Sequence, residues 1–193
     1  AFQYSGGVFT PIDSLERRWV PRDFRDVFDD GRVSTLVQDH GVTKLFTSDL
    51  LKKSFLSNTT FVDSADVWGS MMYDFDGDGK FDIVARTSSQ YLVFRNLGEN
   101  NFQLAARLNN PTKPLPGDAS NQFGPPRSLV ADFSGTGNAE LIFADYDGDV
   151  VLYRQVDKQS APFQFQLAWR DTSDLFETSD YLAAGDFDGD GRM

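Results

Sequence analysis

The chain has 193 residues, 40% of them hydrophobic and 14% aromatic, which is enough for a sizeable core in one large domain or two small ones. Its formal net charge of −11 disfavours binding to nucleic acid or to an anionic membrane, and its apolar runs are too short to span a bilayer. Because the chain has no Cys and one His, disulfides and thiolate chemistry are excluded and a zinc site is disfavoured.

Short hydrophobic segments separated by Gly, Asp and Asn predict an all-β fold made of brief strands and turns. Residues 1–22 lack a clear periodicity, and we interpret them as a leader or linker segment. From residue 23 the pattern alternates between strand and turn. The strands expected in the first part of the chain are residues 32–37, 43–47, 67–72, 82–86, 90–95 and 102–107.

The second part of the chain repeats this order of strands. Residues 109–126 are rich in Pro, Gly and Asn and are expected to form a surface connection. The strands expected after this connection are residues 128–131, 141–144, 149–154, 163–169 and 181–185.

An acidic stretch at residues 74–82 organises the pattern. Its carboxylates are those of Asp74, Asp76, Asp78 and Asp82. Like charges 4 Å apart repel by about 1 kcal/mol in water and about 4 kcal/mol at an effective dielectric constant of 20, and a bound cation would remove this repulsion. Oxygen ligands at alternate positions, with Gly between them, favour Ca²⁺. The alternative is a polar turn in which the Asp side chains bond their own backbone.

Partial copies of this stretch recur along the chain. The loops begin at Asp74, Asp132 and Asp186, and a degenerate first copy is expected to begin at Asp23. A period of about 55 residues with four strands per unit is the size of a β-propeller blade. Strands such as residues 91–94 are apolar on both faces, as expected for blades that lie between neighbours.

The opening of the acidic stretch also fits an EF-hand, which has Asp at positions 1, 3 and 5 and Gly at position 6. An EF-hand needs a bidentate Glu at position 12. The chain has Ala85 and Phe143 there, and the flanking residues have the pattern of strands. These residues disfavour the EF-hand interpretation.

The stretch resembles the Asp-x-Asp-Gly-Asp-Gly-x-x-Asp calcium loop of FG-GAP or VCBS repeats, which occur in integrin-α-like β-propellers. The resemblance covers residues 23–193 and is strongest at residues 74–82. It implies a β-propeller of four-stranded blades, of which this chain would hold about three and the start of another. We therefore expect residues 23–193 to be an incomplete domain, part of a propeller of about seven blades.

In that family, the side chains at loop positions 1, 3, 5 and 9 and the carbonyl at position 7 hold Ca²⁺. Carried over, the first metal site would consist of Asp74, Asp76, Asp78, Asp82 and the carbonyl of Lys80. The second would consist of Asp132, Ser134, Thr136, Glu140 and the carbonyl of Asn138. The third would consist of Asp186, Asp188, Asp190 and the carbonyl of Arg192, and its ninth position falls after Met193. Two hydroxyls replace carboxylates in the second site, so we expect a weaker affinity there.

Aromatic residues recur beside these loops. Phe75, Phe133 and Phe187 hold position 2 and are expected to pack each loop against its blade. Trp68 and Trp169 are expected in the core between blades, with stacking on a sugar ring as the alternative for a Trp at the rim.

The resemblance implies a calcium-stabilised binding or scaffold module, secreted or at the cell surface, within a larger protein. Its partners would be a protein or glycan ligand and further blades or domains of the same protein. A propeller-based polysaccharide lyase or hydrolase is one alternative, and a purely structural spacer is another. The chain has no evident catalytic set, which favours a role other than enzyme catalysis and leaves the enzyme alternative open.

Overall fold

The computed structural model describes residues 2–5, 8–11, 20–39, 42–49, 54–63, 67–87, 90–109, 128–144, 150–171 and 184–187. Within these residues all regular secondary structure is β-strand and no helix occurs. The prediction of an all-β fold is therefore confirmed.

The described strands form three four-stranded sheets and one separate hairpin. The hairpin consists of β1 (Phe2–Ser5) and β2 (Val8–Pro11). The first sheet consists of β3 (Val20–Arg25), β4 (Ser34–Asp39), β5 (Val42–Asp49) and β6 (Ser54–Asp63). The second sheet consists of β7 (Val67–Tyr73), β8 (Asp82–Thr87), β9 (Gln90–Asn96) and β10 (Phe102–Asn109). The third sheet consists of β11 (Ser128–Ala131), β12 (Glu140–Ala144), β13 (Val150–Asp157) and β14 (Ala161–Asp171).

Each four-stranded sheet is an antiparallel meander whose strands follow one another in chain order. This arrangement confirms the four-stranded units predicted for the second and third sheets. None of the sheets closes on itself among the described residues. The complete propeller ring remains a prediction.

The strand prediction missed three features of the structure. The strand β3 was not expected, and it begins inside residues 1–22, which were interpreted as a leader or linker segment. Residues 184–185, which were expected to end a strand, are not in a strand. Residues 2–11 contain the hairpin of β1 and β2, because Phe, Tyr, Val and Thr in this segment suit a pleated strand. The strand β6 was not expected, since its sequence mixes Ser, Asn and Asp with the apolar residues. It pairs along β5 and completes the first sheet. Residues 110–127, which include most of the predicted surface connection, lie outside the described residues.

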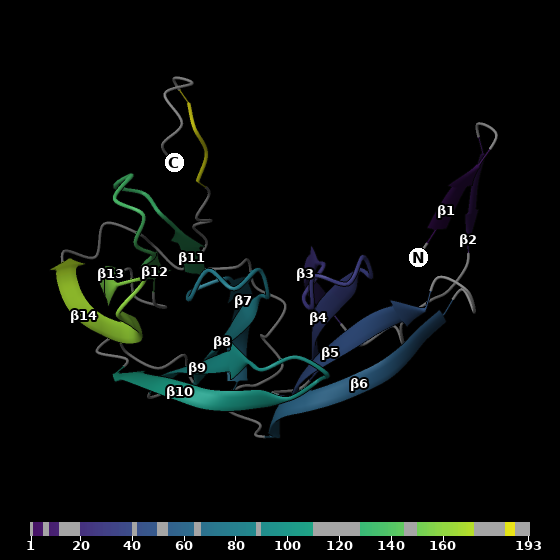
Figure 1. Cartoon of the computed structure of the whole chain (residues 1–193), viewed down its shortest axis with the longest axis horizontal. Coiled ribbons are helices and arrows are strands. Elements are labelled where there is room, and N and C mark those ends of the chain that lie inside the picture. The colour runs from purple at the N-terminus through teal and green to yellow at the C-terminus, as the bar shows by residue number, and fades with distance from the viewer. Residues whose placement is uncertain are drawn as a thin grey trace.

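The three sheets lie side by side along an arc (Figure 1), and the second sheet is in the middle. The first strand of the second sheet, β7, contacts β3 on one side and β11 on the other. One apolar cluster joins the first and second sheets through Val27, Leu36, Leu45, Met72 and Ile83. A larger cluster joins the second and third sheets through Phe75, Val84, Tyr91, Val93, Leu108, Ala139, Leu141, Phe143, Val151 and Tyr153.

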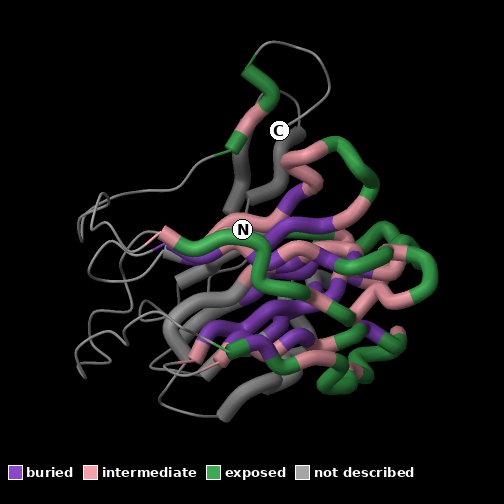
Figure 2. Tube along the Cα trace, turned by 90° about the vertical axis from the view of Figure 1, so that its left-hand side faces the viewer, coloured by how far each residue is buried: buried purple, intermediate pink, exposed green. Residues whose placement is uncertain are grey.

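Adjacent residues of β8 contribute to different clusters because neighbouring side chains in a strand point to opposite faces. Ile83 packs with the first sheet and Val84 with the third, and both are almost completely buried. The strand β8 is therefore buried on both faces, as the apolar strand pattern predicted, whereas most side chains of the outer strand β10 are exposed. Figure 2 shows the buried segments stacked in the middle of the molecule, with exposed loops along one side.

Buried side-chain amides also connect neighbouring sheets. Asn96, the last residue of β9, donates its Nδ2–H to the carbonyl of Val27 in the first sheet unit at 2.8 Å. Gln155, near the end of β13, donates its Nε2–H to the carbonyl of Phe75 in the second sheet unit at 2.8 Å. The same connection thus occurs at both interfaces between sheets.

The amide of Gln155 yields a first prediction. Replacing Gln155 with Ala should lower the free energy of unfolding by about 3 kcal/mol, because the carbonyl of Phe75 and the N–H of Ala139 would lose their buried partner. Urea denaturation measures this loss. Gln164→Ala, at an exposed position of β14, is the matched control and should change stability by less than about 0.5 kcal/mol. Equal losses in the two variants would contradict the role of Gln155.

Candidate metal centre

The 74–82 loop connects β7 to β8 at one end of the second sheet. Gly77 and Gly79 adopt left-handed φ angles of 75° and 87°, which L side chains rarely adopt. Their N–H groups donate to the two carboxylate oxygens of Asp74, at 2.7 Å and 3.2 Å. The loop therefore folds around the Asp74 side chain.

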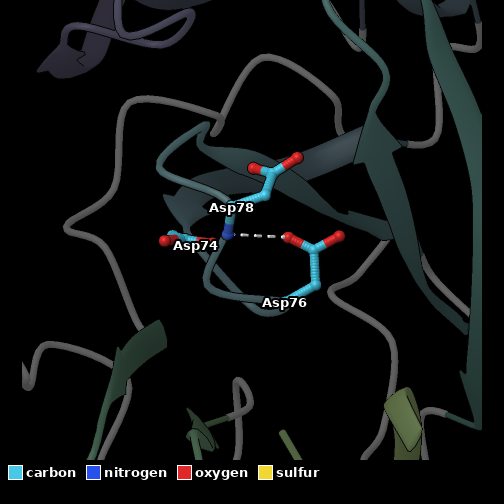
Figure 3. A group of neighbouring side chains, drawn as sticks. All are labelled: Asp74, Asp76 and Asp78. Atoms are coloured by element: carbon cyan, nitrogen blue, oxygen red, sulfur yellow. Dashed lines mark hydrogen bonds between the residues drawn. The ribbon is translucent and has the colours of Figure 1, made fainter. Parts of the chain in front are cut away.

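Three of the predicted carboxylates gather in this loop, as Figure 3 shows. Ligand oxygens of Asp74, Asp76 and Asp78 all lie within 4.8 Å of one another. Asp76 Oδ1 accepts a hydrogen bond from the Asp78 N–H at 3.3 Å, drawn dashed in Figure 3. Asp78 in turn accepts from the N–H of Lys80 at 2.9 Å and from Lys80 Nζ at 2.8 Å. Both the carboxylate cluster and the polar turn expected from the sequence are present.

Asp82, the fourth predicted carboxylate, is buried and bonded to the backbone. Its Oδ2 accepts from the Phe75 N–H at 3.0 Å and its Oδ1 from the Asn96 N–H at 2.8 Å. Burial raises the pKa of Asp82 to about 7, and the two backbone hydrogen bonds only partly oppose this shift. Asp82 ties the loop to β8 and to the end of β9, and its role as a metal ligand remains a prediction.

Arg95 is a residue of the site that the sequence interpretation missed. Its Nη2 lies 2.8 Å from Asp76 Oδ2, and the Asp76 side chain is only 8% exposed. Within the described part of the chain, this oxygen has no donor in hydrogen-bonding geometry. The sequence signal was a repeated pair at the end of the third strand, Arg95-Asn96 and Arg154-Gln155, in which the basic residue precedes the amide.

The 132–140 loop connects β11 to β12 and is closed by its own hydrogen bonds. Asp132 accepts from the N–H groups of Thr136 and Gly137 at 2.9 Å and 2.6 Å. The Ser134 and Thr136 hydroxyls bond each other at 3.0 Å. These contacts occupy groups that were predicted to hold a second ion.

Glu140, the last predicted side-chain ligand of the 132–140 loop, also has protein partners. Glu140 is buried, accepts from the Ser134 N–H at 2.9 Å, and forms an ion pair with Arg154 Nε at 3.0 Å. The predicted ligand of Asn138 was its backbone carbonyl, and the bond of this residue in the loop is made by its side chain, whose Oδ1 accepts from the Lys158 N–H at 2.9 Å. Among the residues described, the carboxylate group that could hold a metal is the one at residues 74–78. The weaker second site remains a prediction.

The first copy of the loop begins at Asp26, and the prediction that it begins at Asp23 is wrong. Asp26 accepts from the N–H groups of Asp30 and Gly31 at 3.0 Å and 2.7 Å. Gly31 has a φ of 79°, so this pair corresponds to Asp74 and Gly79. Asp23 instead lies in β3 and pairs with Leu36. The start at Asp26 was not recognised in the sequence because the third position of this loop is Phe28 in place of Asp.

The last predicted loop is described only at its beginning. Asp186 is exposed, and Asp188, Asp190 and Arg192 lie outside the described residues. Phe187 is 91% exposed, whereas Phe75 at the same loop position is completely buried and Phe133 is partly buried. The packing predicted for position 2 is therefore confirmed at Phe75 and wrong at Phe187.

The predicted core position of the two Trp residues can be tested at Trp169 only. Trp169 is 50% exposed on β14, so the prediction that it belongs to the core between sheets is wrong. The reason is its position on the last strand of the third sheet, where most side chains face solvent. The side chain of Trp68 lies outside the described residues.

Comparison with known proteins produced no match to a family model or to a curated protein sequence. The resemblance to FG-GAP or VCBS repeats is therefore a prediction that rests on the loop residues themselves. Among the residues described, no helix is long and apolar enough to cross a membrane.

The buried Asp82 carboxyl predicts a pH dependence of stability in the metal-free protein. The unfolded pKa of Asp is about 3.9, so folding takes up a proton between pH 4 and the folded pKa of about 7. This contribution is present at low pH and is lost as the pH rises toward 7. Relative to the Asp82→Asn variant, which cannot titrate there, the wild type should lose about 2 kcal/mol between pH 5.5 and 7.5. Urea denaturation after metal removal tests this, and a constant difference would contradict it.

Proposed function

We propose that the 74–82 loop binds Ca²⁺ and that the protein is a calcium-stabilised binding or scaffold module of the β-propeller type. The carrying observation is the group of three carboxylates whose oxygens lie within 4.8 Å of one another. The buried Asp76 Oδ2 accepts no hydrogen bond within the described residues, and the group beside it is the Arg95 guanidinium at 2.8 Å, so the position of this oxygen suits a positive charge.

The residues present fit the chemistry of calcium. Ca²⁺ takes six to eight oxygen ligands and tolerates flexible geometry. Asp74, Asp76 and Asp78 supply carboxylate oxygens, and each oxygen keeps a lone pair beyond its present hydrogen bond. The resemblance adds the carbonyl of Lys80, and water would complete the shell.

Calcium in this loop would stabilise the fold. The loop carries Phe75, which is completely buried in the cluster between the second and third sheets. Any ligand that binds the folded chain in preference to the unfolded chain adds to its stability. A site of this kind is useful where calcium is millimolar, which is why we propose a secreted or cell-surface location.

The repeated connections between sheets support the propeller. Successive sheets are related by equivalent amide hydrogen bonds and by equivalent loops, and they follow one another along an arc (Figure 1). Continuing this relation would give a closed ring of four-stranded blades, for which we keep the expected number of about seven. In such a ring the module would offer a rigid surface to which a protein or glycan ligand binds.

A third prediction concerns the calcium increment, by which we mean the gain in thermal stability of the protein in calcium over the protein in chelator. With a dissociation constant near 0.1 mM, millimolar Ca²⁺ should add about 1.4 kcal/mol over the metal-free protein, which corresponds to roughly 4 °C in Tm. Asp76→Asn should abolish most of this increment, because it removes the charge of a central ligand. Differential scanning calorimetry in calcium and in chelator measures both values.

Ser134→Ala is the matched control, because Ser134 has the same loop position in the 132–140 loop. This variant should keep the calcium increment of the wild type. If the wild type melts at the same temperature in calcium and in chelator, the 74–82 loop is not a calcium site. An increment that survives in Asp76→Asn and disappears in Ser134→Ala would place the ion in the other loop.

A further inference from the structure

Two cationic side chains of the protein form ion pairs with carboxylates of the 74–82 loop. Arg95 lies 2.8 Å from Asp76, and Lys80 Nζ lies 2.8 Å from Asp78. Two positive side chains therefore face the three gathered carboxylates. Because a divalent ion would bring the same charge to the same oxygens, these side chains and the ion compete for one place.

Arg95 reaches the loop from the adjacent β9 and is held on its other side by the third sheet. Its guanidinium carbon lies 5.7 Å from the centre of the Phe163 ring, a residue of β14. The Arg95 side chain is 44% exposed, so it has a path to solvent, whereas Asp76 is 8% exposed and remains at the loop. Arg95 is thus anchored by a ring contact that does not require Asp76.

The equivalent residue of the third sheet shows a different arrangement. Arg154 Nε donates to Glu140 Oε1 at 3.0 Å, and this is a well-formed hydrogen bond. Arg95 neutralises Asp76 at a similar distance without such a bond to Asp76 Oδ2. A charge-assisted hydrogen bond is stronger than charge proximity alone, so the contact of Arg95 is the easier one to exchange.

We propose that Arg95 is a tethered counter-cation that occupies Asp76 in the metal-free protein and sets the calcium affinity of the 74–82 loop by competition. Calcium binding displaces the guanidinium toward solvent while it remains over Phe163. Lys80 has the same role at Asp78. This inference rests on the proposed calcium function and assigns its affinity to residues outside the ligand set.

Isothermal titration with CaCl₂ tests the proposal on the full chain. Arg95→Gln should bind Ca²⁺ about fivefold more tightly than the wild type, since a competing ion pair of this kind contributes about 1 kcal/mol. Arg95→Lys keeps the charge and should stay within about twofold of the wild type. Arg107→Gln removes the same charge from an exposed position of β10 and should also leave the affinity unchanged within about twofold.

Lys80→Gln is a second variant, in case the loss of the contact with Phe163 prevents Arg95→Gln from folding. It should bind Ca²⁺ about threefold more tightly than the wild type. If the wild type binds calcium and neither neutral variant gains affinity, the competition is overturned and the calcium site stands. If wild type and variants all fail to bind, the calcium site itself is wrong. Binding that appears only in the neutral variants would support the competition in its strongest form.

Discussion

The interfaces between neighbouring sheets depend on a buried side-chain amide at the end of the third strand. Asn96 donates its Nδ2–H to the carbonyls of Val27 and Phe81, and its backbone N–H donates to Asp82. One residue thus joins the preceding sheet to the end of its own loop. Apolar side chains bury the faces without direction, whereas this amide fixes how far and at what register one sheet lies against the next.

The geometry of the candidate metal centre depends on these hydrogen bonds between neighbouring sheets. The 74–82 loop is anchored at its end by Asp82 and near its start by Phe75, whose carbonyl accepts from Gln155 of the third sheet. The carboxylates of Asp76 and Asp78 lie between these anchors, and that of Asp74 comes directly before the first one. Folding therefore brings like charges together before any ion arrives, and the nearby Arg95 and Lys80 offset their repulsion.

The three described loops show how one backbone can serve two purposes. In each, the first Asp accepts N–H bonds from within the loop, including that of the Gly at position 6. That polar turn needs no ion. Gathered carboxylates occur where positions 3 and 5 are also Asp, as in the 74–82 loop. The 132–140 loop has hydroxyls at these positions, and they bond each other.

Much of the fold could be predicted because its signals are local. Strand alternation, turn glycines and the repeated acidic stretch are properties of neighbouring residues, and they identified the four-stranded units of the second and third sheets and the 74–78 cluster. The sequence patterns failed where strand formation or side-chain burial depended on residues distant in the sequence. The polar β6 forms because β5 offers it a partner, and Phe187 is exposed although its sequence setting matches that of the buried Phe75.

By itself, the sequence determined the period of the repeat, the β character of the units and the loop that can gather carboxylates, since backbone propensity and charge spacing act over a few residues. Tertiary structure alone decided which side chains complete the site. Arg95 is 19 positions after Asp76 in sequence and meets it because β9 lies beside β8. The tertiary structure also decided that Asp82 is buried and bonded to the backbone, because burial depends on the sheets that pack around a residue.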